Sequence, residues 1–187
     1  LSKDSLIHFT FAGNIGKVQN LENIIEAFLL LPSNYQKRAQ LNIIGDGSNI
    51  ANLKRLSNNN PNIIFHGRKK REDMFKFYQA SDFLIVSLVD DPIFSVTVPA
   101  KVQTYIAAKK PILAIINGDT ADLVINNKLG LHANPSDINS IQKTFMHCID
   151  MDEREKENFS GQSDKLLKND FNKNKIIDRL TNVLLNN

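Results

Sequence analysis

The sequence predicts an α/β fold: a doubly wound parallel sheet of the Rossmann-like kind. Two observations carry this prediction. Short apolar runs alternate with longer segments whose apolar residues recur at helical spacing, which indicates repeated β–α–β units. The short runs are apolar throughout, as expected for strands whose two faces are both covered by helices. Right-handed crossovers between such strands produce a doubly wound sheet.

The first half of the chain contains three predicted strands. The first spans 6–12 and ends at Gly13, and the helix after it has apolar residues at positions 21, 24, 25, 28 and 29 before Pro32 closes it. A second strand at 41–44 runs into a Gly-Asp-Gly turn. Apolar positions 50, 53 and 56 predict the next helix, which ends in an Asn-rich turn before a third strand at 63–65.

The second half continues the alternation. A helix over 72–79 precedes a strand at 83–86, and a proline-containing loop leads to a helix over 99–109. Pro99 suits the first position of that helix, because the amide proton that proline lacks has no helical partner there. The remaining elements, read from apolar runs and periodicity, are strands at 111–115 and 129–131 and helices at 121–125, 135–150 and 160–186.

The composition indicates one soluble globular domain. Of the 187 residues, 42% are hydrophobic and 23% are charged. Cys148 is the single cysteine, which excludes an internal disulfide and a multi-cysteine metal site. The four histidines lack metal-ligand spacing, so no metal is expected. No apolar run long enough to span a membrane and no signal peptide is present.

Charge argues against a dedicated nucleic-acid binder, because the net charge is only +3. The main basic cluster is the segment 66–71, His-Gly-Arg-Lys-Lys-Arg. It is either a solvated loop or a segment that attracts anions.

The candidate site consists of the loops that follow the strands. In doubly wound sheets the ligand lies beyond the carboxyl ends of the strands, near the point where the strand order reverses. Those loops begin at Gly13, Gly45, Gly67, Ser87 and Ile116.

The loop after the first strand has the spacing G-x-x-G, which counts against a nicotinamide dehydrogenase. It is either an anion-binding turn before a helix or a plain strand-to-helix turn. In the fourth crossover, Lys101 falls in the first turn of the 99–109 helix, where a cation opposes the helix dipole at a cost of about 0.3–1 kcal/mol. A bound phosphate would reverse that sign; alternatively, the lysine extends into solvent.

Four segments, at 11–16, 43–47, 62–67 and 98–114, carry a resemblance to a known family. In this order they resemble the C-terminal, donor-binding domain of GT-B fold glycosyltransferases of family 4 type. The Gly-Asn-Ile-Gly opening at 13–16 and the Val-Pro-x-Lys helix start resemble most the subgroup that builds bacterial capsule and O-antigen sugars, including N-acetyl-fucosaminyl transferases. The similarity covers about residues 6–150.

The resemblance implies a role for each loop. The loop after the first strand would face the donor diphosphate, the end of the third strand would hold the base, and the loop before Pro99 would cradle the sugar and the β-phosphate. Lys17 and Lys101 are the candidates for stabilising the leaving diphosphate, and no other catalytic residue is assigned. The substrate-binding residues implied in this way are Gly13, Asn14, Gly16, Lys17, Gln19, Gly67, Arg68, Ser95, Val96, Thr97, Val98, Lys101 and Thr104.

The chain departs from the family pattern at several positions. Many members carry two glutamates, separated by seven residues, where Val96 and Thr104 stand here. The second glutamate grips the ribose hydroxyls in the family, and Thr104 offers one hydroxyl for that contact. Asn14 and Gln19 replace the usual Arg and Lys of the first loop. Lys109 replaces a glycine.

The resemblance implies that residues 1–187 form one half of a GT-B architecture, a nucleotide-sugar binding domain with a C-terminal helical segment at about 152–187. The N-terminal acceptor domain is expected to be absent from this chain. The whole protein would be a bacterial, retaining, metal-independent glycosyltransferase without a cofactor. It would move a sugar from a UDP-sugar to a lipid-linked or oligosaccharide acceptor in surface polysaccharide biosynthesis.

The expected partners are the nucleotide-sugar and the absent domain, with no nucleic acid. A cytoplasmic location is expected, and contact with the inner face of the membrane through the absent domain stays open. The domain alone is expected to be inactive. One alternative is a non-catalytic nucleotide-sugar binding or partner-interaction module that has lost the acidic pair. Another is a generic doubly wound domain, such as half of a sugar-nucleotide epimerase.

Overall fold

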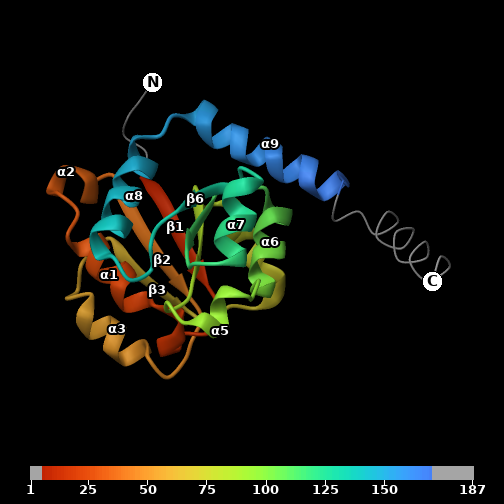
Figure 1. Ribbon diagram of the computed structural model, residues 1–187. Coiled ribbons are helices and arrows are strands. Elements are labelled where there is room, and N and C mark those ends of the chain that lie inside the picture. Colours follow the sequence, from red (N-terminus) through yellow and green to blue (C-terminus); the bar gives the residue numbers. More distant parts are fainter. Residues whose placement is uncertain (1–5, 170–187) are drawn as a thin grey trace.

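The computed structural model describes residues 6–169 and contains a parallel sheet in the order β3-β2-β1-β4-β5-β6 (Figure 1). Every adjacent strand pair in it is parallel. The predicted doubly wound α/β fold is therefore confirmed. The order reverses between β1 and β4, which is the switch point. The strands are β1 (Ile7–Ala12), β2 (Ala39–Ile44), β3 (Ile63–Gly67), β4 (Phe83–Ser87), β5 (Ile112–Ile115) and β6 (Gly130–His132).

Helices flank both faces of the sheet (Figure 1). They are α1 (Leu21–Leu29), α2 (Ser33–Gln36), α3 (Ile50–Leu56), α4 (Met74–Gln79), α5 (Pro92–Ser95), α6 (Ala100–Ala108), α7 (Asp119–Asn126), α8 (Ile138–Asp150) and α9 (Glu153–Asn169), with 3-10 turns η1 (Lys17–Gln19) and η2 (Arg71–Asp73). The short elements α2, α5, η1 and η2 are additions to the predicted pattern.

Several predicted helix starts were wrong, and two of them have a local explanation. Pro99 is the N-cap of α6 and not its first residue, because its ψ of 138° is extended while its carbonyl accepts the amide of Val102. Helix α8 starts at Ile138 and not at 135, because the Asp137 carboxylate accepts the amides of Asn139 and Ser140 and caps the helix there. The helix predicted over 160–186 begins at 153 as α9, and its part beyond 169 lies outside the described residues.

Apolar layers on both faces hold the sheet. Along β4, Phe83 and Ile85 enter one layer, and Leu84 and Val86 enter the other. The first layer includes α1 and α8, and the Phe9 ring stacks on Phe83 with centroids 5.4 Å apart. Each fully buried side chain of this size stabilises the fold by about 1.5–3 kcal/mol.

The second face is polar where it underlies β1, β2 and β3. Asn42 is buried on this face, and its Oδ1 lies 2.8 Å from His66 Nε2. The Ser81 hydroxyl, just after α4, donates to Thr10 Oγ1 at 2.6 Å. The His66 ring also packs edge-on against Phe77 of α4 at 5.4 Å. These contacts fix α4 against the sheet next to the end of β3.

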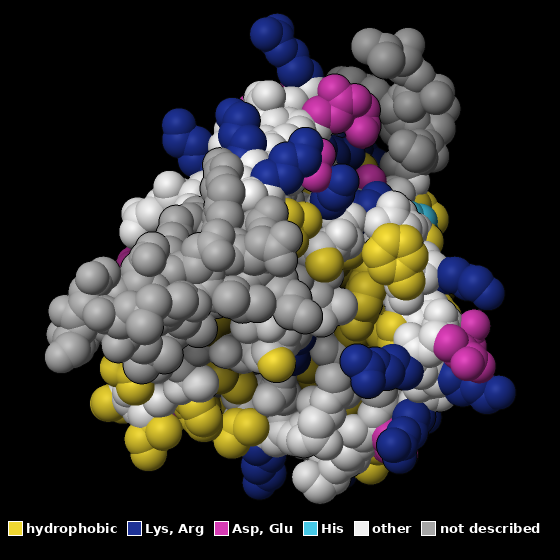
Figure 2. Space-filling view, turned by 90° about the vertical axis from the view of Figure 1, so that its right-hand side faces the viewer, with side chains coloured by type: hydrophobic (Ala, Val, Ile, Leu, Met, Phe, Trp, Pro, Cys, Tyr) yellow, Lys and Arg dark blue, Asp and Glu magenta, His cyan; other side chains and the backbone are white. Residues whose placement is uncertain are grey.

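Helix α9 crosses from α8 to α6 along one side of the sheet (Figure 1). Lys156 of this helix is buried. Its Nζ lies 2.7 Å from the Glu153 carboxylate and 3.7 Å from that of Asp82. At the other end, Lys109 pairs with Asp164 at 2.7 Å. On this side of the molecule, Lys and Arg side chains surround exposed hydrophobic side chains (Figure 2). None of the helices between residues 6 and 169 has the length and hydropathy needed to cross a bilayer.

Candidate functional site

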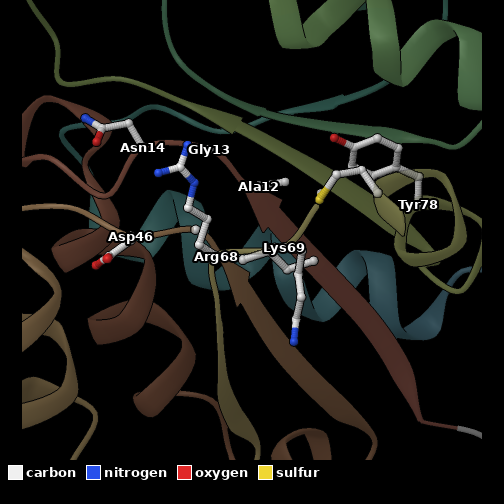
Figure 3. A pocket seen from close by; sticks show the side chains of 10 residues that line it. Ala12, Gly13, Asn14, Asp46, Arg68, Lys69 and Tyr78 are labelled. Carbon is white, nitrogen blue, oxygen red and sulfur yellow. The ribbon is translucent and has the colours of Figure 1, made fainter. Parts of the chain in front are cut away.

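A cavity of about 460 Å³ opens where β1, β2 and β3 end, beside the switch point (Figure 3). Its walls come from the loops after these three strands and from α4. They are Ala12, Gly13, Asn14, Ile44, Gly45, Asp46, Arg68, Lys69, Met74 and Tyr78. The predicted location, at the carboxyl ends of the strands, therefore holds a cavity.

The floor of this cavity is made of backbone packed too closely for side chains. Gly13 donates its amide to Ile44 O at 3.0 Å, and Ile15 donates to Asp46 O at 2.9 Å, so the first two loops are joined side by side. Gly45 has φ +138°, and a Cβ on it would lie 1.9 Å from Gly13 O. Only glycine permits that approach. The two loops thus present exposed backbone to the cavity.

Lys101 reaches this floor from the first turn of α6. Its Nζ donates to Gln19 Oε1 at 3.0 Å and lies 4.1 Å from the centroid of the Phe11 ring. A Cβ on Gly13 would lie 3.0 Å from the same Nζ. The structure therefore brings together Gly13, Gln19 and Lys101, three residues that the sequence predicted as ligands of one diphosphate.

The electrostatic setting of Lys101 is unusual for a lysine. Within residues 6–169 it forms no ion pair with a carboxylate. Burial lowers its pKa to about 8, because desolvation penalises the charged amine. The start of α6 adds a further unfavourable dipole. An anion at this point would relieve both costs.

Asn14 and Arg68 lie at the mouth of the cavity. Both side chains are exposed, from the loops after β1 and β3 respectively. Gly67, just before Arg68, has φ +66°, and its carbonyl oxygen accepts a hydrogen bond from the Gly45 amide at 3.0 Å, so the third loop is joined to the second. Burial, and secondly the charge of Lys69, hold the pKa of His66 below its usual value. The cavity is thus bordered by cations.

The loop at 95–98, which the resemblance assigns to the sugar and the β-phosphate, has its hydroxyls engaged in local hydrogen bonds. The Ser95 hydroxyl donates to Pro92 O at 2.7 Å, and that of Thr97 donates to Ile93 O at 2.9 Å, so local carbonyls occupy both hydroxyls. Val96 and Val98 are 74% and 41% exposed. The surface that this loop presents is consequently apolar.

Some predicted site residues lie outside the cavity wall. Gly16 is buried as the N-cap of η1, and Lys17 is exposed in η1, which separates the first loop from α1. Thr104 is exposed on α6, one residue before the buried Tyr105. The structure does not bring these residues into the cavity lining, and the same holds for Gln19, Gly67, Lys101 and the segment 95–98; the predicted residues that do line the cavity are Gly13, Asn14 and Arg68.

Other lining residues were missed from the sequence. Asp46 stands in a Gly-Asp-Gly turn, and this sequence pattern indicates only a structural turn into α3. Met74 and Tyr78 are spaced as core positions of α4; Tyr78 does pack against the apolar layer, and both residues also form part of the cavity wall. The signal that identifies them is their place on the helix directly after the third loop. Burial raises the pKa of the Tyr78 phenol, so that hydroxyl stays protonated at neutral pH.

With the geometry of the cavity described, the chain can be compared with known protein families. Residues 2–176 match the family described as glycosyl transferases group 1. The chain belongs to this family.

Sequence relatives of this group 1 domain are longer proteins. The probable glycosyltransferase WbjE of Pseudomonas aeruginosa is 26% identical over 148 residues, which are 77% of this chain and 36% of WbjE. A glycosyltransferase of Methanocaldococcus jannaschii is 34% identical over 83 residues, 21% of its length. The matched part of the chain thus spans about a third of one relative and about a fifth of the other.

Solved structures of glycosyltransferases share the fold. Anabaena HepE, solved in complex with UDP, aligns with a TM-score of 0.78 at 14% identity over 99% of this chain and 50% of HepE. The C-terminal domain of a group 1 protein, LpcC of Francisella tularensis, aligns with a TM-score of 0.71 at 17% identity, covering 88% of this chain and 86% of that domain. The group 1 chain therefore has the fold of one such domain.

Proposed function

We propose that this chain is the donor-binding domain of a glycosyltransferase that takes its sugar from a UDP-sugar. Family membership and the UDP in the HepE structure support a nucleotide-sugar ligand. The observation that carries the proposal is the ammonium of Lys101, held against Gly13 and Gln19 with no carboxylate partner among the described residues. A donor diphosphate is the anion that the family would supply there.

In this proposal a lysine of α6 supplies the charge that the first loop lacks. Gln19 stands where the resembling family carries lysine, and Lys101 Nζ lies 3.0 Å from the Gln19 side-chain oxygen. The amine therefore reaches the first loop from the neighbouring crossover. As the bond to the sugar breaks, negative charge grows on the leaving diphosphate, and a fixed cation in a partly buried site stabilises it. Lys17 is the second candidate for that role.

The other loops take the remaining parts of the donor. Gly67 and Arg68 would hold the base at the cavity mouth, and Thr104 would accept the ribose hydroxyls once the donor is bound. The segment 95–98 would lie against the sugar through its exposed valines. With Asn14 and Gly16, these residues make the proposed donor site. Neither a metal nor a cofactor is required in this scheme.

The finer assignment follows the sequence resemblance. We place the protein among enzymes of bacterial surface polysaccharide synthesis, near the N-acetyl-fucosaminyl transferases. The donor would be a UDP-N-acetyl sugar, and the acceptor lipid-linked or an oligosaccharide, with retention at the transferred carbon. An N-terminal domain would bind the acceptor, so the present domain alone is not expected to turn over. A cytoplasmic location fits this role.

One observation favours a second candidate, a non-catalytic nucleotide-sugar binding module. The two acidic positions of the family are Val96 and Thr104 here, and both side chains are exposed. A chain without those carboxylates can still bind the donor. Joining the domain to its N-terminal half and assaying sugar transfer separates the two candidates.

The test of donor binding compares UDP with uridine by calorimetry. A charge-assisted contact is worth about 1.5–3 kcal/mol. Lys101→Met should therefore lower the affinity for UDP by about tenfold or more and leave the affinity for uridine nearly unchanged. Lys143→Met, which removes an exposed lysine on α8, is the matched control and should leave both affinities unchanged. An equal loss for UDP and uridine would show that Lys101 has a structural role only.

A further inference from the structure

The segment that contains η2 and α4 carries exposed basic side chains and an exposed aromatic ring. We define this α4 surface by Lys70, Arg71, Phe75 and Lys76, all of which are exposed. Phe75 is 57% exposed, although nothing in the donor site uses its ring. Arg71 lies in η2, directly before α4, which carries Phe75. Arg68 and Lys69, which precede this surface, are residues of the cavity lining, and the Lys69 ammonium lies 5.8 Å from the centroid of the Phe77 ring.

The basic charge here is concentrated. Residues 68–76 hold five basic and two acidic side chains, a net charge of +3, which equals the net charge of the whole chain. The local acids do not neutralise it. Lys70 lies 3.8 Å from Glu72 and Lys76 lies 3.5 Å from Asp73, with both lysine side chains at least 80% exposed. Exposed pairs of this length contribute little.

We propose that the α4 surface binds the headgroup region of an anionic lipid bilayer. Basic side chains at an interface are drawn to anionic lipids, and an aromatic ring beside them enters the boundary between headgroups and acyl chains. Phe75 supplies the ring, and Lys70, Arg71 and Lys76 supply the charge. Single-stranded nucleic acid would instead require a groove with several stacking rings, whereas this surface is one helix face with one exposed ring.

This orientation places the donor cavity beside the bilayer. Arg68 and Lys69 line the cavity and directly precede the α4 surface, so a bilayer against α4 lies next to the cavity mouth. An acceptor carried by a lipid would meet the donor there. The membrane contact itself does not depend on donor binding, because the residues of the α4 surface are not among those that line the cavity.

Vesicle co-sedimentation of the 187-residue chain tests the proposal. Vesicles of phosphatidylcholine mixed with phosphatidylglycerol should bind the chain, pure phosphatidylcholine should not, and added salt should weaken binding. Each basic side chain at an anionic bilayer strengthens binding about fivefold. Lys70→Glu combined with Arg71→Glu should therefore weaken binding by at least about 25-fold. Phe75→Ser should weaken it by about tenfold or more.

A charge-matched variant on another face is the control. Lys54→Glu combined with Arg55→Glu changes two exposed basic residues of α3 and produces the same net charge. It should retain most of the vesicle binding. Unchanged UDP affinity in all variants shows that they are folded. Equal losses in the α3 and α4 variants, no effect of Phe75→Ser, or equally tight binding to a single-stranded oligonucleotide would each overturn the proposal.

Discussion

Replacing Lys101 by methionine should raise the unfolding free energy of the free domain and weaken its binding of the donor. Methionine has nearly the shape of lysine without its charge, so it fills the space beside Phe11 and removes a poorly solvated ammonium. Lys101 lies beside Gly13, which lines the cavity, and a residue that is unfavourable for folding at such a place is expected when it is retained for binding a ligand. This substitution therefore separates a ligand-binding role from a structural one.

The magnitude follows from the pKa. The Lys101 amine falls from an ordinary pKa of 10.5 to about 8, which corresponds to roughly 3 kcal/mol of penalty on the charged form. Methionine also loses the hydrogen bond to Gln19, worth about 1 kcal/mol. Remaining solvent contact reduces the penalty further, so the expected gain in unfolding free energy at pH 7 is about 1–2 kcal/mol.

The gain should depend on pH with a definite sign. Below pH 8 the lysine is charged in both folded and unfolded states, and the full penalty is present. Between about pH 8 and 10.5 the folded state loses its proton first, so the parent chain becomes more stable relative to the variant. Above 10.5 the difference should disappear, apart from the lost hydrogen bond.

Urea unfolding of the two chains at pH 7, 9 and 10.5 measures this difference, with the Lys143→Met variant as the reference for an exposed lysine. A lower unfolding free energy of Lys101→Met at pH 7 would refute the reasoning. It would mean that the contacts with Gln19 and Phe11 outweigh the cost of burying the charge.

Three other substitutions or treatments test the remaining parts of the account. Thr104→Glu should raise the affinity for UDP by about fivefold, since hydrogen bonds to a charged group exceed neutral ones by roughly 1 kcal/mol. An unchanged or weaker affinity in the folded variant would refute the placement of the ribose at Thr104. UDP affinity should be the same with and without EDTA, and loss of binding in EDTA would contradict a metal-independent site. Gly45→Ala should lower the free energy of unfolding by roughly 2 kcal/mol or more, because its Cβ would lie 1.9 Å from Gly13 O. A variant as stable as the parent in urea would show that the loops after β1 and β2 can separate.

The alternation of apolar runs and helical periodicity sufficed to predict the sheet. Each predicted strand is present, because strands covered by helices are predominantly apolar, even where β1 and β2 carry polar residues such as Thr10 and Asn42 on one face. The ends of helices were less predictable. Pro99 and Asp137 decide where α6 and α8 begin through carbonyl and carboxylate hydrogen bonds, which apolar periodicity does not report.

The location of the candidate site could be predicted from the sequence, but only some of its residues could. The loops after β1 and β3 line the cavity, as expected from parallel strands that end at one edge. The contact between Lys101 and Gln19 joins residues 82 positions apart, and it depends on how far the α6 side chain reaches across Phe11. Tyr78 reads as a core residue of α4, yet that short helix leaves the ring at the cavity wall.

Lys109 shows how a departure from the family pattern is accommodated. It adopts φ +56° at the end of α6, a conformation that favours glycine, which is the residue that the family carries there. Its ammonium pairs with Asp164 of α9 at 2.7 Å. That long-range pair offsets part of the backbone strain, and no local pattern in the sequence could have predicted it.

The most direct test is an amide NMR titration of the chain with UDP. The account predicts saturable shifts concentrated in the loops after β1, β2 and β3 and at the start of α6, with the affinity at least about tenfold lower in Lys101→Met. Shifts that fail to saturate, or that gather on α9 while the three loops stay unchanged, would contradict a donor site at the switch point.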